Sequence, residues 1–121
     1  MDDLVKANLS GANLSHLRLR AYLTGANLTG ADLTGTNLEG AQLEGARLMG
    51  AILRGVDMRK ANLTGADLTG ADLREARLTN TNLTGANLSG ADVRKSNLDS
   101  AITTHANLEG IKGTGSGADF R

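Results

Sequence analysis

The sequence contains no cysteine, no proline and no tryptophan, and one tyrosine and one phenylalanine are its only aromatic residues. Without cysteine there is neither a disulfide nor a reactive thiol, so the chain carries no sign of a redox compartment. An interior without aromatic rings has to be built mainly from leucine and alanine. Thirteen basic residues balance thirteen acidic ones, which removes any whole-chain attraction to nucleic acid or anionic lipid.

Long hydrophobic runs are also missing. The first ten residues, MDDLVKANLS, lack the basic region and the apolar stretch of a secretory signal peptide. No stretch of the sequence has the length and hydrophobicity of a membrane span. We therefore expect a cytoplasmic, single-domain protein without membrane contact.

A short repeat fills most of the chain. From residue 21 to residue 110 the sequence divides without a gap into eighteen five-residue units with the pattern Ala-(Asn/Asp)-Leu-x-Gly, as in ANLTGADLTG at 61–70. The third place is leucine in fifteen of these units, and the first place is alanine in fourteen. Self-similarity at a fixed short period is typical of a solenoid.

The period of five argues against a helix. A step of five residues turns an α-helix by about 140°, so the leucines would spiral around it without forming an apolar stripe. In an extended segment, alanine and leucine two places apart share one side, and the Asn or Asp between them points to the other. The last two places have turn chemistry, because glycine tolerates a positive φ. Each unit is therefore predicted to be a three-residue strand and a corner.

These units resemble those of the pentapeptide-repeat family, whose pattern A-(D/N)-L-x-x is matched almost unit for unit over residues 2–110. The resemblance implies an all-β fold, a right-handed quadrilateral β-helix, with about five to six coils in a chain of this length. The four sides are implied by the family, because a period of five alone also permits a triangle. Such regular leucine-centred units look like those of bacterial, especially cyanobacterial, members with undefined roles.

Two departures from the repeat set the expected domain organisation. In the β-helix 1–110, the unit at 17–20 is one residue short, which predicts a register shift and a tightened corner near Arg20. The Gly-rich segment 111–121 is expected to be irregular. It ends in Ala-Asp-Phe at 118–120, so it is either the start of a further coil or a truncated end.

The predicted interior consists of the leucines at the third place of the units. Each buried leucine contributes on the order of 1.5–3 kcal/mol before chain entropy is subtracted. The structural core is expected to include Leu28, Leu33, Leu53, Leu63, Leu68, Leu73, Leu83 and Leu88.

Function has to come from outward-pointing side chains, and stacking the units twenty residues apart brings some of them together. Arg54, Arg74 and Arg94 form a predicted column on one face. The column is either an anion or nucleic-acid contact or a solvated face, and three cations without aromatic residues favour the solvated face. Met49 and Ile52 are outward apolar residues and form a second candidate partner contact, although single exposed apolar residues are common.

No arrangement typical of catalysis stands out from the repeat. The Asn and Asp residues recur at one place in most units, which indicates turn and ladder hydrogen bonds rather than one metal site. His16 and His105 are isolated in the sequence, and the glycines do not form a phosphate-binding loop. We expect no enzyme activity, no cofactor and no metal.

The leading functional hypothesis is a non-catalytic, rod-like scaffold or protein–protein interaction module. Its expected partners are an unidentified protein and, through its end strands, further copies of itself in end-to-end self-association. Contact with nucleic acid is not expected. A third hypothesis, behind the alternative that follows, is that the chain is one module of a larger protein.

The second hypothesis, the alternative to the scaffold, comes from the family resemblance alone. Some members inhibit or protect DNA gyrase by mimicking duplex DNA, as in quinolone resistance. Matching the charge density of B-DNA requires about three net negative charges per coil of about 4.8 Å. A chain with a net charge of zero does not meet this requirement.

Overall fold

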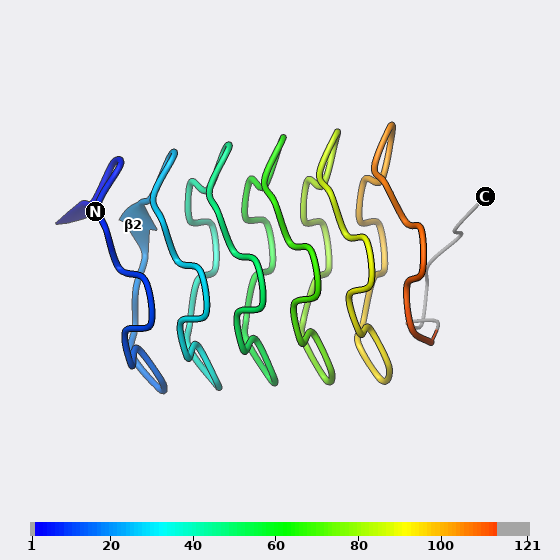
Figure 1. The fold of residues 1–121 in the computed structure, drawn as a ribbon, viewed down its shortest axis with the longest axis horizontal. Coiled ribbons are helices and arrows are strands. Elements are labelled where there is room, and N and C mark those ends of the chain that lie inside the picture. Colours follow the sequence, from blue (N-terminus) through cyan, green and yellow to red (C-terminus); the bar gives the residue numbers. More distant parts are fainter. Residues whose placement is uncertain (1, 114–121) are drawn as a thin grey trace.

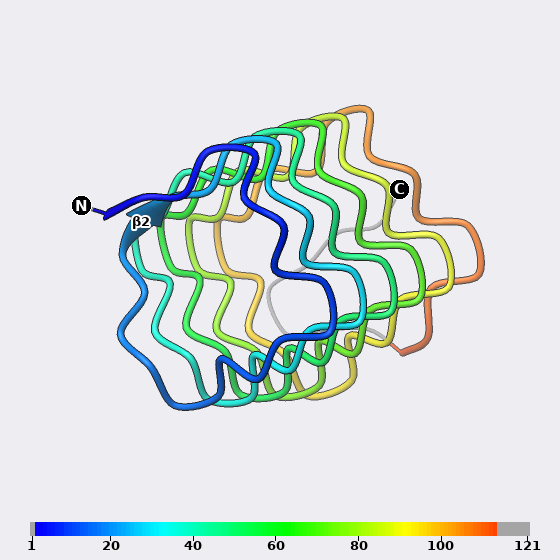
Figure 2. The ribbon, with the colours of Figure 1, turned by 60° about the vertical axis from the view of Figure 1, so that its left-hand side comes forward.

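The structure is a computed structural model that describes residues 2–113. The described chain winds into stacked turns along one axis, from the first turn (blue) at one end of the stack to the last described turn (orange to red) at the other (Figure 1). Seen obliquely to the stack, the successive turns follow the same closed outline (Figure 2). Two strands are long enough to be regular elements in the described part, β1 (Asp2–Asp3) and β2 (Ala21–Tyr22), and they pair in parallel.

The remaining contacts between turns are parallel bridges at the second place of each unit. Tyr22 is paired with Gln42, and Gln42 with Asn62, so one full turn takes twenty residues and four units. The predicted right-handed quadrilateral β-helix is confirmed. Residues 2–100 form five complete turns and residues 101–113 form part of a sixth.

Hydrogen bonds join every turn to the turns on both sides of it. In the unit 66–70, the N–H of Asp67 donates to the carbonyl oxygen of Ala46 in the preceding turn, at 2.9 Å. The N–H of Leu68 donates to the carbonyl oxygen of Asn87 in the following turn, at 2.7 Å. Adjacent residues thus bond in opposite directions along the axis, which is the ladder of a parallel sheet.

The strands are shorter than the predicted three residues. At most units only the residue at the second place forms a bridge. The residue at the first place is engaged in the preceding corner instead, because its N–H donates to a carbonyl three residues earlier, as Ala66 does to Leu63 at 2.9 Å. The corner therefore takes one residue from each predicted strand.

The interior is a stack of leucines and alanines. The eight leucines expected there are exposed by no more than 2% of their surface. Met58 and Val93, which replace leucine at third places, are equally buried, so the interior accepts other apolar side chains of similar volume. Thr103, which replaces leucine near the last described turn, is half-buried.

Two of the polar residues that replace alanine at the first place are fully buried, and their hydroxyl groups are paired. The Thr36 hydroxyl donates to the carbonyl oxygen of Leu14 at 2.6 Å. The Thr81 hydroxyl donates to that of Met58 at 2.7 Å. These bonds offset the cost of placing a hydroxyl in an apolar interior.

The first turn differs from the others in length. Asn8 is paired with Asn27 and Arg18 with Asn37, an offset of nineteen residues, whereas the later bridges have an offset of twenty. The corner between Leu19 and Ala21 contains one residue instead of two, which accounts for the difference. Leu17 takes the place of an inward alanine in this short unit and remains 46% exposed.

At the other end, the ladder continues past the expected boundary at residue 110. Lys112 is paired with Asp92, and its N–H donates to the carbonyl oxygen of Ala91 at 2.8 Å. Residues 111 and 112 were expected to be irregular, but they continue the ladder. The backbone hydrogen bonds of the ladder do not require the side chains of the repeat. The resemblance of residues 118–120 to a new unit lies outside the described residues.

The inward and outward places of one unit predict unequal responses to truncation. Leu68→Ala removes a side chain that is 1% exposed and leaves a cavity, so we expect a loss of about 2–5 kcal/mol in unfolding free energy. Thr69→Ala, at the neighbouring half-buried place, should cost less than about 1.5 kcal/mol, since it removes one hydrogen bond. Urea unfolding followed by circular dichroism measures both losses, and equal losses would contradict the assignment of the two sides.

Every described unit with a two-residue corner has a positive φ at its fifth place. This backbone conformation predicts a second pair of effects on stability. Lys60 has a φ of 62° without being glycine, so Lys60→Gly should raise stability by up to about 1 kcal/mol. Gly65→Ala should lower it by about 1–2 kcal/mol, because φ is 68° there although no atom lies within 4 Å of the added carbon. The same urea unfolding series tests both, and a loss of stability in Lys60→Gly would contradict the conformational argument.

Candidate functional site

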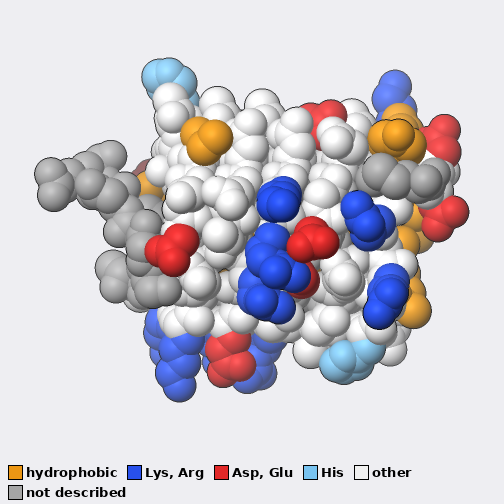
Figure 3. Space-filling view, turned by 180° about the vertical axis from the view of Figure 1, so that it is seen from behind, with side chains coloured by type: hydrophobic (Ala, Val, Ile, Leu, Met, Phe, Trp, Pro, Cys, Tyr) orange, Lys and Arg blue, Asp and Glu red, His pale blue; other side chains and the backbone are white. Residues whose placement is uncertain are grey.

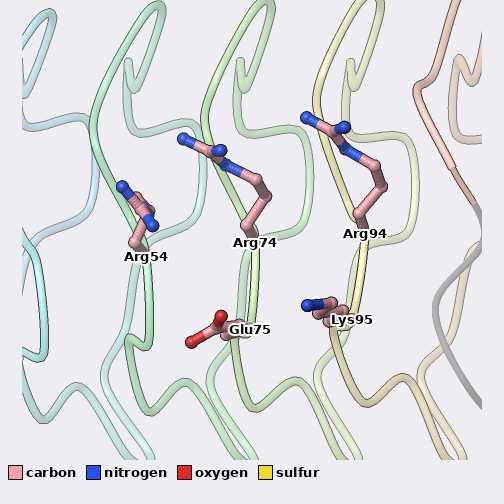
Figure 4. A pocket seen from close by; sticks show the side chains of 5 residues that line it. All are labelled: Arg54, Arg74, Glu75, Arg94 and Lys95. Carbon is pink, nitrogen blue, oxygen red and sulfur yellow. The ribbon is translucent and has the colours of Figure 1, made fainter.

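The outer surface is formed by the second and fourth places of the units, which stack into columns along the rod. We call the face formed by units 51–55, 71–75 and 91–95 the arginine face. Arg54, Arg74 and Arg94 occupy the fourth places on it, and the pairing of Ile52 with Asp72 shows that these units overlie one another. The three arginines thus lie side by side on consecutive turns (Figure 4).

Aspartate and asparagine at the second place hold the corner that follows them. In fifteen units of the described chain, their Oδ1 accepts a hydrogen bond from the backbone N–H two residues later. Asn87 and Ser89 are an example, at 3.0 Å. These side chains therefore serve the turn, as an Asx turn does in other proteins.

Where the second place is aspartate and the fourth is arginine, the two side chains form a bidentate ion pair. Arg74 Nε and Nη2 lie 2.9 and 2.7 Å from Oδ1 and Oδ2 of Asp72. Arg94 makes the same contacts with Asp92, at 2.9 and 2.6 Å. A planar guanidinium meeting a carboxylate at two points is the stronger form of ion pair.

These contacts change the acidity of the two carboxyl groups. Hydrogen bonds from Arg74 hold the pKa of Asp72 below its usual value, and partial burial opposes this shift. Hydrogen bonds from Arg94 lower the pKa of Asp92 to about 2, again against partial burial. Both aspartates are therefore charged at neutral pH and neutralise two of the three arginines.

Arg54 is the exception in the column. The second place of its unit is Ile52, so its own unit supplies no carboxylate. Within residues 2–113, no carboxylate lies within 4 Å of its guanidinium. Its side chain does not follow the common direction of the Arg74 and Arg94 side chains (Figure 4). Arg54 therefore presents an exposed, unpaired guanidinium to solvent.

A shallow pocket of about 210 Å³ lies along the arginine face. It is lined by the three arginines together with Glu75 and Lys95 from the fifth places of their units. Glu75 and Lys95 occupy consecutive turns below the arginines in Figure 4. Four cations and one anion line the pocket, so it favours an anionic group even after Asp72 and Asp92 are counted.

Of the two predicted apolar contacts, Ile52 lies on the arginine face and Met49 lies on the neighbouring face, on either side of the corner at Gly50. Ile52 is 39% exposed, and Met49 is half-buried. Ile102 is also exposed, but it belongs to the face formed by units 21–25, 41–45, 61–65, 81–85 and 101–105, on the opposite side of the rod. The structure therefore places Ile52 in the same unit as Arg54, places Met49 across the corner at the end of the neighbouring face, and keeps Ile102 apart from them.

Sequence reasoning missed a third Asp–Arg ion pair. Arg59 Nε and Nη2 lie 2.9 and 2.7 Å from the carboxylate oxygens of Asp57, and Nη2 also lies 3.2 Å from Glu39 Oε2. The signal that would have found it is the spacing Asp-x-Arg, which places both side chains on the outer side of one unit. On the face in Figure 3, basic and acidic side chains likewise lie side by side, with wide uncharged areas between the clusters.

Residues 2–113 contain neither a group of metal ligands nor a membrane-spanning helix. No group of three or more His, Asp or Glu side chains in this range is arranged to hold a metal ion. The same range includes no helix that is long and apolar enough to cross a membrane. The arginine face and its apolar border are thus the candidate contact surface.

The repeat that builds these faces is also the feature that identifies the chain. The model of a family described as Pentapeptide repeats matches in 8 copies, over residues 3–40, 19–59, 61–99 and 76–112. The chain belongs to the pentapeptide-repeat family. No curated protein sequence matched it.

Solved structures of other pentapeptide-repeat proteins have the same fold. Rfr23 from the cyanobacterium Cyanothece 51142 is 31% identical, with a TM-score of 0.73, and the match covers 91% of this chain and 86% of that one. The protein alr5209 from Nostoc PCC 7120 is 33% identical, with a TM-score of 0.59 and coverages of 91% and 83%. The cyanobacterial resemblance expected from the sequence is confirmed by these two structures.

A fluoroquinolone resistance protein is a more distant match. The plasmid-mediated protein QnrB1 is 21% identical, with a TM-score of 0.47, over 98% of this chain and 70% of that one. An identity and a TM-score this low support no conclusion about function.

The ion pairs of the arginine face predict a pH dependence of stability for this pentapeptide-repeat protein. The pKa of Asp92 is about 2 in the folded chain and about 3.9 in the unfolded chain, so the unfolded chain binds the proton first. The resulting stabilisation is present above about pH 4 and is lost as the pH falls through about 2. The double variant Asp72→Asn, Asp92→Asn keeps an Oδ1 acceptor for each turn but loses the pH-dependent stabilisation.

Urea unfolding at pH 5 and pH 2.5 measures the effect. We expect wild type to lose more unfolding free energy than the double variant between these two values. Arg94→Gln removes the hydrogen bonds that are the largest cause of the lowered Asp92 pKa. We expect this variant, too, to lose less unfolding free energy than wild type between pH 5 and pH 2.5. Identical losses in all three proteins would contradict the role of the ion pairs.

Proposed function

We propose that this pentapeptide-repeat protein is a non-catalytic, rod-shaped scaffold that binds another protein through an outer face. The observation that carries the proposal is the separation of roles within each unit. The backbone and the inward side chains build the rod, while the second and fourth places point outward and vary. Such a rod holds surface side chains in fixed relative positions over several turns, which suits binding rather than chemistry.

The distribution of irregular residues supports one face over the others. Threonine or serine occupies nine of the eighteen fourth places between residues 21 and 110, whereas the arginine face has three consecutive arginines. Apolar residues of the same region, Met49 and Ile52, lie at its border. Protein interfaces are enriched in arginine and methionine relative to the rest of the surface.

Imitation of DNA is the alternative that these observations disfavour. A DNA mimic has to present rows of unpaired acidic groups along its length. Here Asp57, Asp72 and Asp92 are each neutralised by an arginine of their own unit. The arginine face has the opposite sign to that required.

Site-specific photo-crosslinking in cells that naturally contain the protein tests the proposal. A photoreactive amino acid at Thr34, next to Arg54 on the preceding turn, should form adducts with another protein. The same substitution at Thr84, on the opposite side of the rod, is the matched control and should form few. Absence of protein adducts from both positions and from the other two faces would rule out the interaction role.

A supercoiling assay with DNA gyrase tests the alternative function, imitation of DNA. We expect no inhibition of supercoiling and no protection against a quinolone at micromolar concentrations of the protein, because its charge is balanced. Inhibition at those concentrations would instead favour the gyrase hypothesis.

A further inference from the structure

Arg54 and its apolar neighbours form a more specific site than the column as a whole. We propose that Arg54, Ile52 and Met49 together bind a short segment of a protein partner in which an acidic residue lies beside an apolar one. This inference rests on the proposed function, since it names the chemistry of the partner and the place where it docks.

The first step is that the Arg54 guanidinium has no ion pair within the described structure, although its charge contributes to the lowered pKa of Asp72. The nearest carboxylate of the following turn, Asp72, accepts bonds from Arg74 at both of its oxygens. That of the preceding turn, Asp32, accepts two bonds from Thr34, at 3.0 and 2.7 Å. Both neighbours therefore have other partners, and Arg54 retains its full donor capacity.

The second step is that the free guanidinium is adjacent to exposed apolar surface. Ile52 is two places before Arg54 and points outward from the same unit, where Asp72 and Asp92 point outward from theirs. Met49 is half-buried at the fourth place of the preceding unit, just before the corner. A ligand that meets Arg54 thus covers an aliphatic side chain at the same time.

The third step decides between a peptide and a nucleic acid. A nucleic acid would need several unpaired cations in succession, but Arg74 and Arg94 already share their charge with Asp72 and Asp92. An isolated phosphate would leave Ile52 uncovered. A carboxylate beside an apolar side chain satisfies both features, and arginine is well suited to bind a carboxylate at two points.

The repeat itself supplies the test variant. Ile52→Asp converts the unit 51–55 to Ala-Asp-Leu-Arg-Gly, the arrangement in which Asp72 holds Arg74. The new aspartate should accept the N–H and the guanidinium of Arg54, so the variant should be at least as stable as wild type. It removes the apolar contact and occupies the guanidinium without deleting Arg54. Ile102→Asp is the matched control, because it makes the same substitution on the opposite face. The fourth place of that unit, residue 104, is threonine and not arginine.

The experiment is a selection of displayed random heptapeptides on the full chain, followed by fluorescence anisotropy of the selected peptides. We expect enrichment of Asp or Glu next to an aliphatic residue. Binding should weaken about tenfold or more in Ile52→Asp and in Arg54→Gln, and should be unchanged in Ile102→Asp. Replacing the acidic residue of the peptide by its amide should have the same effect as Arg54→Gln.

Three outcomes would overturn the inference. One is a selection without acidic enrichment, and another is equal affinity of the selected peptides for wild type and Ile52→Asp. The third is that a single-stranded oligonucleotide binds wild type more tightly than the peptides and loses affinity in Arg54→Gln. If crosslinking from other faces still captures a protein partner in these cases, the scaffold proposal stands and only the docking site is wrong.

Discussion

The hydrogen bonds between turns are the interaction on which the rest of the structure depends. Within one unit, the second N–H bonds to the turn before and the third and fifth bond to the turn after. The first N–H closes the corner on a carbonyl three residues earlier, and the fourth is met by the Asn or Asp side chain of the same unit. A unit such as 66–70 therefore leaves no N–H without an acceptor, which is what a tightly coiled backbone requires. Most of these bonds are independent of the outward side chains, so those side chains vary without disturbing the fold.

The interior depends on this ladder because no turn buries its own leucines. Each layer of Leu and Ala is covered by the layers before and after it, so a defect is felt mainly by its neighbours. The exposed fractions agree with this picture: Leu63 and Leu68 are buried in the middle of the stack, whereas Leu4 and Leu9 in the first described turn are half-buried. Since the interior is made of layers with nearly the same composition, it contains no residue with distinctive chemistry. Specificity has to come from the surface.

Much of this could be predicted from the sequence, because the period of five and the alternation within a unit are directly readable. The inward leucines follow from those two numbers alone, whereas the column of Arg54, Arg74 and Arg94 also needed the four units per turn that the family resemblance implied. Strand length did not follow, since it depends on how many residues the corner engages. The continuation of the ladder to Lys112 did not follow either, because backbone bonds are insensitive to the loss of the side-chain pattern. The difference between Arg54 and Arg74 required the side-chain positions, although the Asp-x-Arg spacing contains the necessary information.

Residue 52 is isoleucine where the next two turns have aspartate, and this difference has two physical consequences. It removes an acceptor from the corner and from Arg54, and it places aliphatic surface where a charge stands on the next two turns. Neither change reaches the ladder or the interior, since Leu53 remains fully buried and its N–H still donates to the following turn, 2.7 Å from the carbonyl oxygen of Asp72. Residue 52 can therefore present aliphatic surface without disturbing the ladder or the interior. In a repeat protein of this kind, the places that depart from the outward consensus while keeping the inward one are where recognition is expected.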